Sequence, residues 1–351
     1  MSSVSRFPFP VFRSLRLSLC LIVFAALAGA GLRGAGAKPP LRRVARAQYR
    51  MGTVLEIDAV GPARERLEAA IARAFGEVAR AESRLSNWRA DSELSRANRA
   101  ASLAPVSLSA ETFWSLGRAL RLARETDGAF DPTVGGVIRA LGLTGESPDP
   151  ERAIRARSGI GWRRVLLDSR SRTLSFASPG TSLDSGAFGK GEALDRAVAA
   201  LRAGGVVAAR LNFGGQIALL GAGSREARRI GFNRVVVATP DGRRAPACGF
   251  LAAGGSVSTS GDAEKPGHLI DPKTGGPAAF HGSVTVIADT ALRADILSTA
   301  LFVMGPREGL AFADRRGIAA LFLVRKGETL SAASSRAFPH LSARSIGRRF
   351  S

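Results

Sequence analysis

The order of strand and helix patterns along the chain is the feature that most restricts its fold. Apolar and polar positions alternate in residues 49–60, as in a strand, and a long helical pattern follows in residues 63–86. Further strand patterns then come in succession, in residues 208–221, 229–240, 248–261, 282–289 and 318–327, without a helix between each pair. Strands in runs, mixed with helices that do not alternate strictly with them, predict an α+β fold with mainly antiparallel sheets flanked by helices.

The remaining patterns supply helices and one small hairpin. Helical spacing of apolar residues predicts helices over residues 109–128, 192–205 and 290–305, the first of them beginning at Ser109. Residues 162–168 and 173–179 are predicted to form a hairpin. The strand pattern of residues 208–221 contains Gly214 and Gly215, which indicate a bulge or a close approach of two backbone segments.

The charge of the chain favours an acidic partner without naming it. The chain has 351 residues, of which 45% are hydrophobic and 23% charged, so it can bury a large core as a globular protein. Its formal net charge of +21 suits a phosphorylated ligand, anionic lipid or nucleic acid, although arginines that are merely solvated would give the same total. Clusters occur only at Arg42–Arg46 and at the C-terminus, and no aromatic residues are interleaved with them, so no nucleic acid partner is expected.

The first residues have the pattern of a secretory signal peptide. Arginines precede an apolar run at residues 17–32, and the small residues Ala35–Ala37 offer a cleavage site before Lys38. We therefore expect a signal peptide over residues 1–37, a main domain over residues 38–340 and a basic tail over residues 341–351. An uncleaved membrane anchor is the alternative. Either way the protein is expected to be exported, and to be periplasmic or associated with the periplasmic face of the inner membrane.

The predicted signal peptide also limits the disulfides and cysteine-based metal sites that the chain can form. Cys20 lies inside the apolar run, so a cleaved chain keeps Cys248 alone. A single cysteine excludes an internal disulfide and a site of clustered cysteine ligands. Cys248 is expected to be a small buried side chain.

Two glycine-containing loops hold candidate binding residues. Residues 126–136 (TDGAFDPTVGG) place Asp131 on a rigid loop, where its carboxylate could accept from a ligand; an ordinary Asp-Pro turn is the alternative. Residues 181–197 (TSLDSGAFGKGEALDRA) combine Asp184, glycines and Lys190 before a helix. That combination suits an anion, but it does not match the P-loop pattern, and a simple turn between strand and helix explains it equally well.

Two later segments add a histidine and a set of oxygen ligands. The segment HLIDPKTGGPA puts His268 near Asp271, close along the chain to SVSTSGD; a structural role is the alternative for a lone histidine. The segment ALRADILSTALF sets Asp295 and Thr299 four residues apart, on one face of a helix. Oxygen ligands suit Mg²⁺, a hard cation that often bridges to phosphate, whereas a hydrogen-bonded pair would account for the same two residues.

Taken in order, these motifs resemble the ApbE family, the FAD:protein FMN transferases. The resemblance extends over most of the chain and is carried by eight collinear segments: MGT, ESRLSNWRADSELSRAN, TDGAFDPTVGGV, LDSGAFGKGEALDRA, LNFGGQIALLG, STSGD, HLIDPKTGGPA and ADILSTALFVMG. It implies an ApbE-like, T-fold-like domain. It also implies an enzyme that takes FAD as donor with Mg²⁺, attaches FMN through its phosphate to a Thr or Ser hydroxyl of an acceptor protein, and releases AMP.

The resemblance also implies roles for particular residues. The flavin nucleotide would be contacted by Met51, Trp88, Ala129, Phe130, Asp131, Asp184, Lys190 and Ile270. The Mg²⁺ ion would be held by Asp295, Thr299 and the backbone carbonyl of Ala187. His268 would be a general base near the pyrophosphate, and Asp184 is the other candidate for handling the proton. The acceptor is expected to be periplasmic or membrane-associated.

Three departures from the family pattern concern the wall of the flavin site and the entry of the acceptor. Ala263 replaces an aromatic residue after Asp262, the segment before His268 is short, and Gln216 stands where an aspartate is frequent. Two alternatives to the transferase therefore stay open. One is an Mg²⁺-dependent FAD pyrophosphatase that gives FMN and AMP, and the other is a non-enzymatic protein that binds FAD, or an anionic surface through its arginines.

Overall fold

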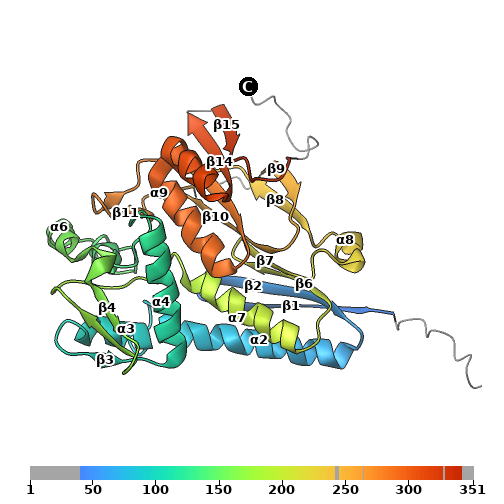
Figure 1. The fold of residues 1–351 in the computed structure, drawn as a ribbon, viewed down its shortest axis with the longest axis horizontal. Coiled ribbons are helices and arrows are strands. Elements are labelled where there is room, and N and C mark those ends of the chain that lie inside the picture. Colours follow the sequence, from blue (N-terminus) through green and yellow to red (C-terminus); the bar gives the residue numbers. More distant parts are fainter. Residues whose placement is uncertain (1–39, 242–244, 264, 327–328, 342–351) are drawn as a thin grey trace, which may run out of the picture. The chain divides into compact units, whose positions relative to one another are not determined.

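The computed structural model describes residues 40–241, 245–263, 265–326 and 329–341. The predicted signal peptide, residues 1–37, lies outside the described residues, as do all residues of the predicted basic tail except Leu341. The described chain has the predicted α+β architecture of a mainly antiparallel sheet flanked by helices (Figure 1). Within these described ranges, no helix combines the length and the apolar character that a membrane span requires.

One eight-stranded sheet forms the centre of the domain. Its strand order is β1-β2-β6-β7-β10-β13-β14-β15, and every neighbouring pair is antiparallel. The strands are β1 (Arg42–Arg50), β2 (Thr53–Gly61), β6 (Ala208–Phe213), β7 (Gln216–Leu220), β10 (Gly255–Gly261), β13 (Gly282–Ala288), β14 (Ala319–Lys326) and β15 (Thr329–Ser334). Alternate residues of β2, such as Leu55 and Ile57, are fully buried, as the period of a strand with one covered face requires.

Three long helices cover one face of this sheet: α2 (Arg64–Leu85), α7 (Gly189–Ala203) and α9 (Ala291–Arg316). The buried residues of α2 recur at intervals of three and four, from Leu67 through Ile71, Ala74 and Val78, which gives the helix one apolar face. This face packs with α7 against β1, β2, β6 and β7. The helix α9 packs against β10, β13 and β14 and is interrupted at Gly305, where φ is 74° and Pro306 follows.

Smaller elements pack around this centre. A second cluster of buried residues joins α9 to the long segment between β2 and α7. The helices of this segment are α3 (Glu93–Ala100), α4 (Ala110–Glu125), α5 (Gly135–Ala140) and α6 (Pro150–Ala156). It also contains two 3₁₀ turns (Arg157–Gly159 and Trp162–Arg164) and the small sheet β3-β5-β4 (Val106–Ser107, Thr173–Phe176, Val165–Asp168). The helix α8 (Arg225–Ile230) precedes the hairpin β8-β9 (Arg234–Ala238, Pro246–Leu251). This hairpin packs against β7, β10 and β14, and Cys248 is buried there. The short pair β11-β12 (Ile270–Asp271, Gly276–Pro277) completes the elements of the described residues.

Two sequence interpretations were too coarse. Residues 208–221 are not one bulged strand but a hairpin of β6 and β7, whose turn is Gly214–Gly215 with φ of 56° and 92°. Positive φ at both central residues is the geometry of a tight hairpin turn, which two glycines adopt without strain. Residues 248–261 likewise form β9 and β10, not one strand. The strand β1, whose arginines and alanines give it little apolar alternation, was not predicted.

The helices α7 and α9 cap each other's N-termini. Asp195 of α7 accepts hydrogen bonds from the backbone N–H groups of Ala291 and Leu292, at 2.6 and 3.0 Å. In return, Asp295 of α9 accepts from the N–H of Gly191, at 3.1 Å. A carboxylate at a helix N-terminus satisfies free N–H groups and complements the helix dipole. This double cap fixes Asp295 relative to the start of α7, where the candidate site lies.

Candidate functional site

The twelve residues predicted to bind the flavin nucleotide or Mg²⁺, or to transfer a proton, all line one pocket. Its volume is about 700 Å³, which lies within the range of ligand pockets in proteins. The twelve predicted residues in its wall are Met51, Trp88, Ala129, Phe130, Asp131, Asp184, Ala187, Lys190, His268, Ile270, Asp295 and Thr299. They come from segments as far apart in the chain as the β1-β2 turn and α9, so the fold assembles what the sequence only placed in order.

Met51 occupies a strained turn at the edge of the pocket. The hairpin between β1 and β2 turns at Met51 and Gly52, where φ is 47° and 78°. A non-glycine residue with positive φ is uncommon, and here it is held by a hydrogen bond from the Met51 N–H to Glu82 Oε1, at 2.9 Å. The strain is therefore maintained by α2, and it is typical of positions where a side chain is directed to a site.

Trp88 presents an aromatic ring at another part of the pocket wall. It follows α2, and 66% of its surface is exposed, which is unusual for the largest apolar side chain. The ammonium group of Lys265 lies 5.8 Å from the centre of the indole ring, within the range of a cation–π contact. An exposed ring in a pocket wall can stack on a planar ligand ring.

The Asp131 carboxylate is committed to its own loop. Oδ1 accepts from the N–H and hydroxyl of Thr133, at 2.9 and 2.6 Å, and Oδ2 accepts from the N–H of Trp162, at 2.7 Å. The carboxylate thus shapes the loop, as the Asp-Pro turn interpretation requires, and its oxygens are already engaged by protein donors. The neighbouring Phe130 is buried and packs edge to face on Phe188, which anchors the same loop.

The segment from Asp184 to Lys190 connects this loop to the start of α7. The N–H of Asp184 donates to the carbonyl of Pro132, at 2.7 Å, and its carboxylate accepts from the N–H of Gly186, also at 2.7 Å. Burial raises the pKa of Asp184 above its ordinary value, against the opposing effect of the Gly186 hydrogen bond. Lys190 follows in the first turn of α7, with Nζ 4.0 Å from Asp295 Oδ2.

Asp295 stands in a cluster of neutral oxygen atoms. Its Oδ1 accepts from the Ser258 hydroxyl at 3.3 Å, and the Ser260 hydroxyl lies 3.3 Å from Thr299 Oγ1. Ser298 joins the two serines, at 3.4 Å from Ser258 and 2.8 Å from Ser260. Burial raises the pKa of Asp295, and Lys190 opposes that effect, so a second cation beside the carboxylate would favour its charged form.

The three residues predicted to hold Mg²⁺ have the chemistry that a hard divalent cation would need. Asp295, Thr299 and the Ala187 carbonyl supply only oxygen, which Mg²⁺ prefers. Among the described residues, no three His, Cys, Asp or Glu side chains gather into a metal cluster. A single carboxylate with neutral oxygens is a weak ligand set by itself, and it suits an ion that also coordinates the phosphates of a ligand.

His268 is positioned to accept a proton. Its Nδ1 lies against the backbone carbonyl of Lys265, a contact in which Nδ1–H donates and Nε2 is left as an acceptor. Burial lowers the pKa of His268 below its ordinary value, so the ring is neutral near pH 7. By contrast, His281 bonds to Asp262 through Nδ1, at 2.8 Å.

The pocket wall also contains residues other than the twelve predicted ones. The hydroxyls of Ser258 and Ser260 could have been inferred from their spacing of two in a strand, which puts both on one face. Gln216 is buried and donates from Nε2 to the Ala291 carbonyl at 2.8 Å, while its Oε1 has no hydrogen-bond partner among the described residues. Residues 236–240, at the end of β8, form a further part of the pocket wall, which none of the sequence motifs predicted. Ala263, one of the departures from the family pattern, lines the pocket as well.

Comparison with known proteins gives a consistent result. Residues 51–322 match the model of the ApbE family. A protein of Haemophilus influenzae named FAD:protein FMN transferase is 31% identical over 276 residues, which cover 74% of this chain and 79% of that protein. The solved structure of the flavin transferase ApbE from Vibrio cholerae superposes with a TM-score of 0.73 at 29% identity, covering 85% of this chain and 99% of the other.

A second solved structure, the apo form of the flavinyl transferase ApbE from Pseudomonas stutzeri, gives a TM-score of 0.72 at 29% identity and covers 85% of this chain and 96% of the other. The agreement thus extends over sequence and fold together. It confirms the resemblance inferred from the eight collinear motifs, and the chain belongs to the ApbE family.

Proposed function

We propose that this protein is an FAD:protein FMN transferase that moves FMN from FAD to a Thr or Ser hydroxyl of an acceptor protein and releases AMP. The observation that carries the proposal is the convergence of all twelve family positions on one pocket. The names of the relatives support the same reaction.

The pocket offers separate surfaces for the parts of FAD. Trp88 and Met51 supply apolar surface for a planar ring, and the segment Asp184–Lys190 supplies a cation beside a helix start for the pyrophosphate. Lys190 is 4.0 Å from Asp295, which places positive charge beside the oxygen cluster. Charge held in place at a phosphate stabilises the negative charge that develops as the bond to the AMP phosphate breaks.

Two residues of the pocket, His268 and Asp184, are the candidates for proton transfer. The acceptor hydroxyl must lose a proton as its oxygen bonds to the FMN phosphorus. The neutral His268 ring has Nε2 available for that proton, and Asp184, with its raised pKa, is the second group able to exchange one. Both residues line the pocket.

A magnesium ion would be held by Asp295, Thr299 and the Ala187 carbonyl. When bound, Mg²⁺ would supply charge neutralisation at the pyrophosphate and a template for its oxygens. The buried Asp295 carboxylate and the hydroxyls around it are the features of this chain that suit the ion.

The N-terminal pattern supports an exported protein whose acceptor is periplasmic or membrane-associated. A Thr or Ser acceptor is what the resemblance to the family implies, and the side-chain hydroxyl of either residue can form the phosphoester.

Incubation of the protein with FAD, Mg²⁺ and a candidate acceptor tests the proposal. Transfer gives AMP together with a fluorescent acceptor band that survives denaturation, whereas a pyrophosphatase gives AMP and FMN without that band. A protein that only binds FAD gives neither product, and that result would refute both enzymatic readings.

A further inference from the structure

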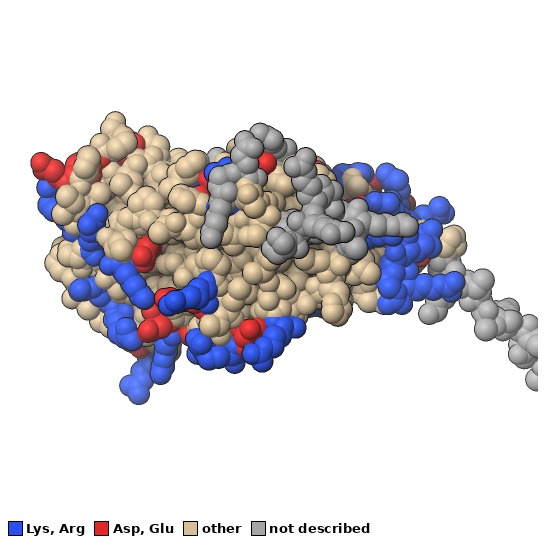
Figure 2. All heavy atoms as spheres, turned by 90° about the horizontal axis from the view of Figure 1, so that it is seen from above, with Lys and Arg blue, Asp and Glu red and all other residues tan. Residues whose placement is uncertain are grey.

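A basic surface lies at the end of the domain where the described chain begins, far from the pocket. It is formed by the start of β1, the link from β2 to α2, the end of α7 and the helix α8 (Figures 1 and 2). Figure 2 shows Lys and Arg side chains gathered there. We call this surface the basic end, and its exposed arginines are Arg42, Arg43, Arg64, Arg66, Arg202, Arg225, Arg228 and Arg229.

Arginines outnumber carboxylates at the basic end, where the acidic side chains are Asp58, Glu65, Glu68 and Glu226. Arg43 pairs with Asp58, Arg64 with Glu68, and Arg229 with Glu226. Among the described residues, no ion pair is formed by the other five arginines: Arg42, Arg66, Arg202, Arg225 and Arg228. Like charges at one end of a domain repel each other, so this end is suited to an anionic partner with many charges.

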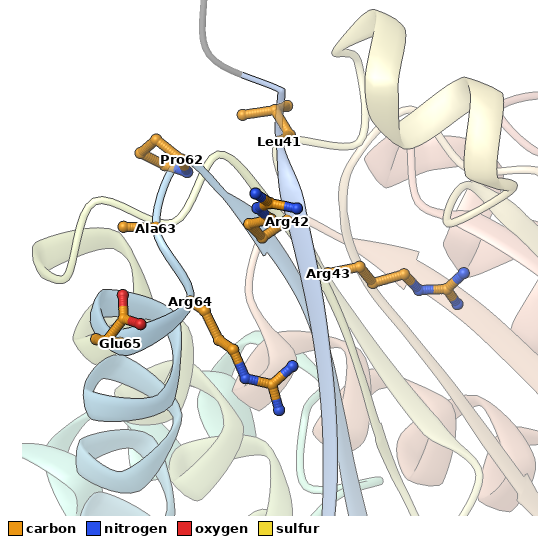
Figure 3. Close-up of a pocket in the computed structure, with 7 residues that line it drawn as sticks. All are labelled: Leu41, Arg42, Arg43, Pro62, Ala63, Arg64 and Glu65. Carbon is orange, nitrogen blue, oxygen red and sulfur yellow. The ribbon is translucent and has the colours of Figure 1, made fainter.

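The basic end also carries apolar side chains and a hollow. Leu41 and Val207 are 37% and 41% exposed, among the few large apolar residues on the surface. The hollow, of about 700 Å³, is lined by Leu41 and by residues of the β1 start and the β2–α2 link (Figure 3). Figure 3 shows the guanidinium groups of Arg42 and Arg64 on one side of β1, with Arg43 directed to the other side. Guanidinium groups beside exposed aliphatic carbon match the phosphate and glycerol region of a lipid.

The sequence supplies an independent reason to choose a lipid surface. The chain enters the basic end at Leu41, nine residues after the apolar run that ends at Leu32. Nine residues span at most about 30 Å even when fully extended. In the alternative in which the run stays uncleaved as a membrane anchor, it would keep this end of the domain close to the headgroups.

We propose that the basic end is a docking surface for an anionic phospholipid bilayer. The strands β1 and β2 run from this end to the turn at Met51, a length of about 27 Å for nine residues at the usual rise. Docking therefore holds the pocket at roughly that height above the headgroups and leaves its mouth free for an acceptor. The proposal concerns an interaction surface, and it does not depend on the transferase reaction.

Hydrogen exchange of the full chain on vesicles tests this proposal. On vesicles of equal parts phosphatidylglycerol and phosphatidylcholine, the amides of residues 61–66 and 221–231 should exchange several-fold more slowly than on phosphatidylcholine alone. Raising the salt concentration should remove the difference, because exposed charges are screened. Amides of α4 serve as an internal reference that should not change.

A matched pair of triple variants separates this surface from net charge. Arg42→Gln, Arg202→Gln and Arg225→Gln together should abolish the protection, since each arginine near an anionic surface contributes about fivefold to binding. The control replaces Arg121, Arg124 and Arg170, three exposed arginines of α4 and the β4–β5 turn, by Gln and should keep the protection. Equal exchange on both kinds of vesicle, or equal loss in both variants, would overturn the proposal. Protection of the same segments by duplex DNA but not by vesicles would overturn it too.

Discussion

The contact between α7 and α9 can be tested by adding one methyl group at Gly191. A Cβ atom on this residue would lie 2.5 Å from the Ala291 carbonyl oxygen and 2.6 Å from the Leu292 Cα, both of which are backbone atoms. Neither can move without separating the helices. Forcing such an overlap typically costs about 1–3 kcal/mol, and alanine in a helix returns about 1 kcal/mol relative to glycine.

We therefore expect Gly191→Ala to lower the free energy of unfolding by up to about 2 kcal/mol. The same displacement moves Asp295, whose carboxylate accepts from the Gly191 N–H, so FAD-dependent release of AMP should fall about ten- to hundredfold. Denaturation in urea measures the first effect as a lower midpoint at unchanged slope.

Gly189→Ala in the same helix is the matched control. Its Cβ would meet the end of the Met51 side chain at 3.3 Å and Ser185 at 3.4 Å, contacts that small side-chain shifts relieve. Its stability should stay within about 1 kcal/mol of the parent. If Gly191→Ala were as stable as the parent and fully active, the close packing of α7 on α9 and the placement of Asp295 through it would be wrong.

Three further variants test single groups. Burial raises the pKa of Asp195 to about 6 from 3.8, so the folded state binds more protons between these values. The free energy of unfolding should therefore fall by about 2 kcal/mol as pH rises from 4 to 7. Asp195→Asn should remove that dependence in urea titrations at several pH values. Trp88→Ala should weaken FAD binding about three- to tenfold in fluorescence titrations while Trp88→Phe retains it, and equal affinity of both would exclude stacking. Thr299→Val should raise the Mg²⁺ concentration needed for AMP release about tenfold or more. Thr299→Ser keeps the hydroxyl and should need the same Mg²⁺ concentration as the parent. If Thr299→Val and the parent depended on Mg²⁺ identically, Thr299 would not be a ligand.

The sequence predicted the fold class because the strands with one buried face keep the period of two. It failed at β1, where arginine and alanine occupy most positions and Val44 is the one buried side chain, so no apolar alternation marks the strand. It also read β6 and β7 as one strand, because a pair of glycines fits a bulge as well as a turn until the partner strand is known.

For the site, the motifs identified the candidate residues but could not predict the hydrogen bonds among them. Nothing in the spacing of Asp131 shows that its oxygens are taken by Thr133 and Trp162, because Trp162 is 31 residues away. The mutual capping of α7 and α9 through Asp195 and Asp295 is equally invisible, since it depends on two helices that are about 100 residues apart in the chain. Tertiary hydrogen bonds of this kind decide which carboxylates remain available to a ligand.

The mass of an acceptor protein after incubation with FAD and Mg²⁺ tests the central claim most directly. The proposed reaction predicts an increase by one FMN less one water, located on a Thr or Ser residue, with one AMP released for each acceptor modified. It also predicts that Asp295→Ala, folded as judged by its denaturation curve, leaves the acceptor mass unchanged. An acceptor of unchanged mass alongside released AMP, or modification that persists in Asp295→Ala, would contradict the account.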